Sequence, residues 1–174
     1  MAKECRDHIF FIGFMGAGKT SVSRCFSHIT NLSLIDVDQR IVALQHKKIP
    51  TIFDEIGEDG FREIECNVLR GLIYEPRSII SCGGGVVCSE KNRKVLSELG
   101  TVIYLRVGLH DAISRISNPA TRPLLSGARP VEEIYEERLP LYKQCADITI
   151  MTGNNTPGHI ARVCRRVLLK KGIL

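Results

Sequence analysis

The sequence contains no tryptophan, and only 6% of its 174 residues are aromatic. Proteins that bind single-stranded nucleic acids usually stack bases on aromatic side chains, so this shortage argues against a nucleic-acid partner. No apolar run approaches the roughly 20 residues that a membrane-spanning helix needs, and the first residues lack the hydrophobic segment of a signal peptide. We therefore expect a cytoplasmic protein with neither a membrane nor a nucleic-acid partner.

The sequence also has no Cys-x-x-Cys pair, although it contains seven cysteines. The odd count and the scatter of these residues favour free, reduced thiols over disulfides. The five histidines show no metal-ligand spacing, so we expect no structural zinc. With 174 residues and 44% hydrophobic content, the chain is long enough to form one domain around a substantial core.

The net charge is +5, and several of the cations lie near the C-terminus, at Arg162, Arg165, Arg166, Lys170 and Lys171. These cations form either a polyanion-binding face or the solvated end of a helix, where positive charge is favourable. The absence of tryptophan and of an aromatic stacking pattern favours the second interpretation. A mild positive balance also suits an enzyme with anionic substrates.

Apolar, β-branched segments alternate with helical segments along the chain. We expect strands at His8–Gly13, Ser33–Asp36, Ser78–Cys82, Thr101–Arg106 and Asp147–Met151. We expect helices at Lys19–Ile29, Asp38–Lys47, Phe61–Ile73, Ser89–Leu99, Leu109–Ile116, Val131–Cys145 and Thr156–Lys171. This alternation predicts a parallel sheet with helices on both faces. Ligands of such sheets bind at the carboxyl ends of the strands.

Directly after the first expected strand, residues 13–20 read Gly-Phe-Met-Gly-Ala-Gly-Lys-Thr, a complete G-x-x-x-x-G-K-[ST] motif. Glycines let backbone N–H groups close around phosphate oxygens, and the following helix adds a partial positive charge at its N-terminus. Lys19 would reach the β- and γ-phosphates, and the Thr20 hydroxyl would bind Mg²⁺. A plain glycine-rich turn is the alternative, but the strand–loop–helix context favours a nucleoside triphosphate site.

Two aspartates, Asp36 and Asp38, follow the second expected strand. In a strand-like geometry their carboxylates would point to the same side, one helping to hold Mg²⁺ through water and the other facing a hydroxyl of a second substrate. The alternative is that the pair caps the next helix. The third strand offers no acidic residue at Ile79–Cys82, so Asp36 is the expected metal carboxylate.

Glycines and arginines complete the set of candidate site residues. The three glycines at 83–85 form either a plain turn or a segment whose backbone a ligand approaches closely. Arg62 and Glu65 lie three residues apart on one helix face. They form either a surface ion pair or a pair that directs the guanidinium toward a carboxylate. Arg138 is a second candidate for that task, because guanidinium groups suit bidentate recognition of carboxylates.

Taken in order, these motifs resemble the shikimate kinase family, in the nucleoside-monophosphate-kinase-like branch of P-loop proteins. Beside the phosphate-binding loop and the aspartate pair, the resemblance rests on Gly60-Phe61-Arg62 with Glu65, Gly83-Gly84-Gly85-Val86, Thr121-Arg122-Pro123-Leu124-Leu125 and Arg138-Leu139-Pro140-Leu141-Tyr142. It spans nearly the whole chain. It implies a three-layer P-loop kinase fold, with a five-stranded parallel sheet flanked by helices.

The resemblance implies that a monomer transfers the γ-phosphate of ATP, with Mg²⁺, to the 3-hydroxyl of shikimate in aromatic amino acid biosynthesis. The nucleotide would contact Gly16, Ala17, Gly18, Lys19, Thr20, Ser21, Arg115, Arg122 and Pro157. Shikimate would contact Asp38, Arg62, Gly83, Gly84, Gly85 and Arg138. Thr20 and Asp36 would bind the metal, and the catalytic residues would be Lys19, Asp38 and Arg122. The acceptor would bind at a helical region at about 38–73, and a lid loop at about 117–129 would close over the site.

Two positions depart from the family pattern. Ser23 stands where the family often has a glycine, and residues 152–157 lack the arginine often found near the adenine. Two alternative functions stay open at this point. One is a related small-molecule kinase acting on gluconate or a nucleoside monophosphate. The other is a non-catalytic nucleotide-binding module, but such a relative would be expected to lose Lys19, Asp38, Arg62 or Arg122, and all four are present.

Overall fold

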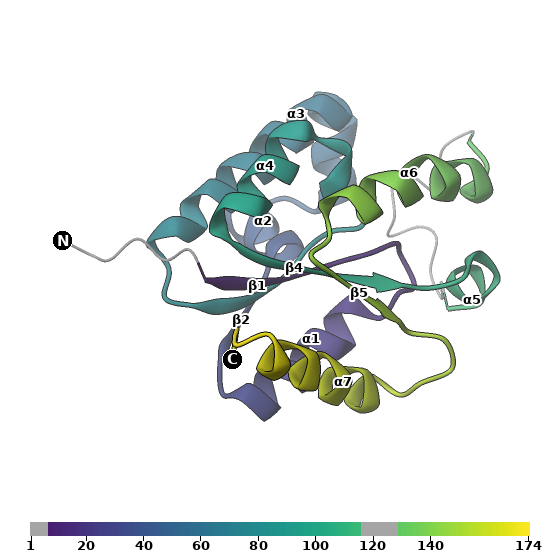
Figure 1. Cartoon of the computed structure of the whole chain (residues 1–174). Coiled ribbons are helices and arrows are strands. Elements are labelled where there is room, and N and C mark those ends of the chain that lie inside the picture. Colours follow the sequence, from purple (N-terminus) through teal and green to yellow (C-terminus); the bar gives the residue numbers. More distant parts are fainter. Residues whose placement is uncertain (1–6, 116–128) are drawn as a thin grey trace.

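The computed structural model describes residues 7–115 and 129–174. A five-stranded parallel sheet in the order β2-β3-β1-β4-β5 forms the middle layer (Figure 1). Its strands are β1 (His8–Ile12), β2 (Ser33–Asp36), β3 (Ser78–Ser81), β4 (Gly100–Arg106) and β5 (Ile148–Met151). The predicted α/β class, the five strands and their parallel direction are therefore confirmed.

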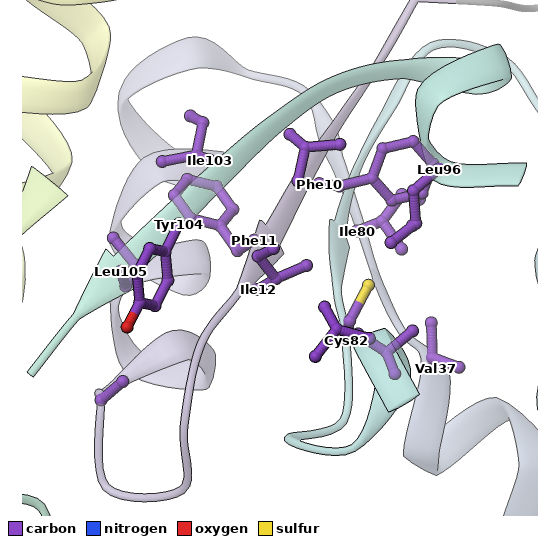
Figure 2. Close-up of a cluster of buried hydrophobic side chains, with 14 of the residues drawn as sticks. Phe10, Phe11, Ile12, Val37, Ile80, Cys82, Leu96, Ile103, Tyr104 and Leu105 are labelled. Carbon is purple, nitrogen blue, oxygen red and sulfur yellow. The ribbon is translucent and has the colours of Figure 1, made fainter. Parts of the chain in front are cut away.

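The central strand β1 is buried along its whole length. It pairs with β3 on one side and β4 on the other, so that Phe10 lies opposite Ile80 and Val102. A strand covered on both faces shows no alternation of polar and apolar residues, which explains the uninterrupted apolar run that precedes the phosphate-binding loop. Figure 2 shows the side chains of this strand among those of its two neighbours.

Helices cover both faces of the sheet. On one face α1 (Lys19–Thr30) packs beside α7 (Pro157–Lys170), and on the other lie α3 (Ile49–Gly71), α4 (Glu90–Leu99) and α6 (Val131–Cys145) (Figure 1). The shorter helices are α2 (Val37–Gln45), which packs against α3, and α5 (Leu109–Ser114), which follows β4. Two 3₁₀ turns, at Leu72–Tyr74 and Val86–Cys88, follow α3 and the glycine segment.

The helix α3 differs most from its prediction. We expected a helix only at Phe61–Ile73, but it begins at Ile49 and includes a break at Gly57, where φ is 71° and ψ is −177°. The helix was expected to begin only after Gly57 and Gly60. Only the first of them interrupts the helical backbone, in a region of φ and ψ that is almost restricted to glycine. A helical segment therefore precedes Gly57.

The predicted lid at about 117–129 lies outside the described residues except for Arg129, which pairs with Glu137 of α6. The six cysteines within residues 7–115 and 129–174 are free. No helix in this part of the chain is long and apolar enough to span a membrane.

The first helix contains a buried hydroxyl group at Ser23, one of the two departures from the family pattern. The Ser23 side chain is fully buried. Within the described part of the chain, its Oγ atom has no hydrogen-bond partner. The burial of a hydroxyl without a partner costs about 1–3 kcal/mol. The hydroxyl is therefore expected to lower the stability of the fold.

We expect Ser23→Ala to raise the free energy of unfolding by about 1 kcal/mol, because alanine removes the unpaired hydroxyl and favours the helix. Urea denaturation of the purified variant measures this change. Ser27→Ala is the matched control on the same helix, since Ser27 Oγ donates to the Leu32 carbonyl at 2.6 Å, and this variant should lose about 1 kcal/mol. A loss of stability in Ser23→Ala would contradict the prediction.

Candidate active site

The phosphate-binding loop connects β1 to α1 and lines a cavity of about 610 Å³. Every residue from Gly16 to Ser21 borders this cavity. The first turn of α1 presents Thr20 and Ser21 at its exposed N-terminus, where unpaired backbone N–H groups and the helix dipole favour an anion. The predicted nucleotide residues of this loop are thus brought together at the end of the central strand.

Lys19 is half-buried at the base of the loop. Its ammonium Nζ donates to the carbonyl oxygens of Gly13 at 2.8 Å and Phe14 at 3.1 Å. These contacts hold the lysine against the loop, with its charge at the border of the cavity. A cation in this position lowers the energy of a polyanionic ligand there.

Asp36 and Asp38 both line the same cavity, but the geometry assumed for them is wrong. The strand β2 ends at Asp36, and α2 begins at Val37, so the two carboxylates are not related by strand alternation. Asp36 is the N-cap residue of α2 and accepts a hydrogen bond from the Gln39 backbone N–H at 3.1 Å. It therefore caps the helix while it borders the cavity, and Asp38 lies in the first turn of α2.

The glycine segment 83–85 is contacted by side chains of the protein itself. A β-carbon at Gly83 would lie 2.8 Å from Asp38 Oδ1, and one at Gly85 would collide with the Arg62 guanidinium. We expected these glycines to admit a ligand. They also admit Asp38 and Arg62, which lie against the backbone where any larger residue would displace them.

Arg62 belongs to a buried network of charged and polar groups. Its Nη1 donates to Glu65 Oε2 at 2.7 Å, and the Asn92 side-chain Nδ2 donates to the same oxygen at 2.8 Å. The Glu65 side chain is 0% exposed and the Arg62 side chain 10% exposed. The pair is therefore buried, and the alternative of a surface ion pair is wrong. Asn92 comes from α4.

The network has opposite effects on the ionisation of its two charged members. Burial raises the pKa of Glu65 more strongly than Arg62 and Asn92 lower it, and the charge of Asp38 also raises it. Burial disfavours the charged guanidinium, but Glu65 and Glu58 more than compensate and raise the pKa of Arg62. The arginine is therefore a permanent cation beside a carboxylate that is easier to protonate than usual.

Arg138 approaches the glycine segment from α6. The residue is 5% exposed, and its Nη1 donates to the Gly84 carbonyl at 3.3 Å. Burial raises the pKa of Tyr142, so this phenol keeps its proton and donates to the same carbonyl. Arg138 and Arg62 both line a second cavity, of about 890 Å³. The two predicted carboxylate-binding arginines therefore converge on one cavity.

The first cavity is also lined by Arg115 and Pro157, the two residues expected beside the adenine. The Arg115 guanidinium donates to the Gly153 carbonyl. Three lining residues were missed by the sequence reasoning, namely Asn154, Asn155 and Ile160. Asn92 and Glu58 were missed around Arg62; for Glu58, the spacing of four residues on one helix was the available signal. Arg122 lies outside the described residues.

A family model described as shikimate kinase matches residues 15–169. The chain belongs to the shikimate kinase family. It is therefore an ATP-dependent phosphotransferase with shikimate kinase activity. The shikimate kinase of Nitrosospira multiformis is 40% identical over 158 residues, which cover 89% of this chain and 81% of that protein. The shikimate kinase of Burkholderia lata is 36% identical over 176 residues, which cover 99% and 96%.

Solved structures of shikimate kinases share the fold. One from Acinetobacter baumannii, in complex with shikimate, has a TM-score of 0.90 at 31% identity and covers 98% of this chain and 97% of its own. Thymidylate kinase from Candida albicans has a TM-score of 0.63 at 12% identity, and covers 97% and 93%. At that identity the likeness concerns the fold alone, which is the P-loop kinase fold expected from the sequence.

For this shikimate kinase family member we expect Asn92→Leu to lower the free energy of unfolding by about 2 kcal/mol at pH 8. The variant removes a hydrogen bond from a buried carboxylate, and so raises the pKa of Glu65 further. Because that pKa is already raised, the contribution of Glu65 to stability is complete below its ordinary pKa and is lost as the pH rises through the raised value. The loss in Asn92→Leu should therefore be smaller at pH 5 than at pH 8. Urea denaturation at both pH values measures it, and an equal loss would contradict this interpretation.

We expect Gly85→Ala to lower the free energy of unfolding by about 1–3 kcal/mol, because the new methyl group forces Arg62 away from its buried partner. Gly71→Ala is the matched control, since a β-carbon there meets no atom within 4 Å in a helical backbone. This variant should gain up to about 1 kcal/mol. Guanidinium denaturation of both variants compares them. Equal stabilities would show that Gly85 does not restrict the position of Arg62.

Proposed function

We propose that the protein transfers the γ-phosphate of Mg-ATP to the 3-hydroxyl of shikimate, and that the cavity lined by the phosphate-binding loop and the cavity lined by Arg62 and Arg138 bind the two substrates. One observation supports this arrangement above all. The cavity with the phosphate-binding loop also contains Asp38 and Gly83, and the segment continues through Gly85 to Arg62, a member of the second cavity. The phosphate of the donor and the anionic group of the acceptor would therefore be separated by a segment of only three residues, 83–85.

On the nucleotide side, the backbone N–H groups of Gly16–Thr20 would bind the phosphates and Lys19 would contact the transferring group. The Thr20 hydroxyl and the Asp36 carboxylate border the same cavity and supply the oxygen ligands that Mg²⁺ prefers. Mg²⁺ usually keeps several waters and takes few ligands from the protein, which suits this small donor set. When bound, the ion would neutralise charge on the β- and γ-phosphates. Arg115 and Pro157 would flank the adenine.

On the acceptor side, Arg62 and Arg138 would bind the carboxylate, and Asp38 would orient the attacking hydroxyl and accept its proton. The lid arginine, Arg122, is proposed to approach the transferring phosphoryl group. The two buried guanidinium groups together with Asp38 suit a small acceptor that carries both an anionic group and a hydroxyl, and because guanidinium groups pair bidentately with carboxylate and phosphate alike, AMP is tested as well. Gluconate also carries a carboxylate, and so it is the alternative acceptor to test.

The first experiment measures ADP release from Mg-ATP in separate reactions that contain shikimate, gluconate or AMP as the acceptor. ADP release with shikimate, and with neither gluconate nor AMP, would support the proposal. ADP release with gluconate would support the proposed donor site but contradict shikimate as the acceptor. Tight ATP binding without turnover on any acceptor would favour a nucleotide-binding module.

Arg62→Ala tests the acceptor site. We expect the KM for shikimate to rise by about 10- to 100-fold, since a charge-assisted contact is lost, with a smaller effect on the KM for ATP. Arg70→Ala is the matched control, because Arg70 is exposed on the same helix and outside both substrate cavities. Initial rates at saturating ATP give the KM values, and an unchanged KM for shikimate would remove Arg62 from the carboxylate site.

A further inference from the structure

The guanidinium of Arg62 contacts two glutamates, which differ in their exposure to solvent. Nη1 contacts Glu65 Oε2 at 2.7 Å, and Nη2 contacts Glu58 Oε1 at 3.0 Å. The Glu65 side chain is 0% exposed, whereas the Glu58 side chain is 42% exposed and lines the second cavity. Glu65 is therefore held by the core, and Glu58 is free to exchange its contact for water at little cost.

Glu58 covers the edge of the guanidinium that a carboxylate ligand needs. Carboxylates bind arginine bidentately through two parallel N–H groups, and Nε with Nη2 forms one such edge. Glu58 occupies Nη2, while Nε is buried and has no hydrogen-bond partner among the described residues. The other edge, Nη1 with Nη2, is occupied by the two glutamates. Neither edge is open to a ligand while Glu58 stays in place.

The charges lead to the same conclusion. One guanidinium beside two ionised carboxylates forms a cluster with a net charge of −1, which repels an anionic acceptor. Arg138 lines the same cavity, so the group of Arg62, Arg138, Glu65 and Glu58 has no net charge, and it carries +1 once Glu58 has left. Departure of Glu58 therefore favours the binding of an anion between the two arginines.

A second cation is available to Glu58 once it moves. Arg129 lines the same cavity; its pKa is raised chiefly by Glu137, and the charge of Glu58 contributes as well. Glu58 and Arg62 lie one turn apart on α3 after the break at Gly57. A rotation of the exposed Glu58 side chain therefore separates Glu58 from Arg62 without movement of the helix.

We propose that Glu58 is an internal placeholder for the acceptor carboxylate, which displaces it from Arg62. This inference rests on the proposed role of Arg62. It makes Glu58 a specificity-determining residue, because an acceptor without a carboxylate cannot compete for the guanidinium and leaves the placeholder in position.

Glu58→Gln tests the inference, since glutamine keeps the shape and removes the negative charge. We expect the KM for shikimate to fall by about three- to fivefold with an unchanged kcat, because the competing ion pair is lost. The KM for the methyl ester of shikimate should not change, because that acceptor has no carboxylate to compete. Glu55→Gln is the matched control on the same helix: Glu55 is exposed, pairs with Lys47 and should leave both KM values at their wild-type level.

The outcomes separate this inference from the proposed function. An unchanged or raised KM for shikimate in Glu58→Gln, with a large increase in Arg62→Ala, would overturn the placeholder and retain the acceptor site. A higher KM would make Glu58 a residue that orients Arg62. An equal fall in the KM for shikimate and in the KM for its methyl ester would also overturn the inference, because the effect of the substitution would then not depend on the carboxylate of the acceptor. If Arg62→Ala leaves the KM for shikimate unchanged, the acceptor site itself is wrong.

Discussion

The close approach of the Arg62 guanidinium to the backbone of Gly85 is the constraint on which the proposed acceptor site depends. The same three-residue segment meets Asp38 at Gly83 and accepts hydrogen bonds from Arg138 and Tyr142 at Gly84. Groups from α2, α3 and α6 are thereby positioned against one short stretch of main chain. A buried ion pair such as Arg62 with Glu65 contributes little net stability; its value here is geometric, because it fixes the direction of a cation.

The proposed nucleotide site and the proposed acceptor site are built by different physical means. The phosphate-binding loop presents backbone N–H groups and a helix N-terminus, whose position follows from the β1–α1 connection itself. The acceptor side depends on side chains that come from separate helices and must be oriented by one another. Glu65, Asn92 and the glycine segment perform that orientation for Arg62.

The sequence was sufficient to predict the sheet and the phosphate-binding loop, because both depend on local patterns: apolar runs, and glycines at fixed spacing. It was insufficient where the cause is tertiary. The spacing of Arg62 and Glu65 is the same in a surface pair and in a buried one, and only the packing of α4 distinguishes them. The carboxylates of Asp36 and Asp38 were expected to point to the same side in a strand-like geometry, although α2 begins at Val37, between them. The residues 49–56 were missed as a helix because the helix was expected to begin only after the glycines at 57 and 60.

The position of each strand in the sheet has a consequence for hydrogen exchange. The phosphate-binding loop is joined to β1, the buried centre of the sheet, whereas α2 follows β2, an edge strand whose four residues are all partly exposed. Amides at the centre exchange only when the whole domain unfolds, while an edge strand opens in smaller, less costly events. The proposed donor loop is thus joined to the strand that we expect to exchange slowest. We expect the aspartates of β2 and α2 to adjoin a unit that opens locally more often than the folded core.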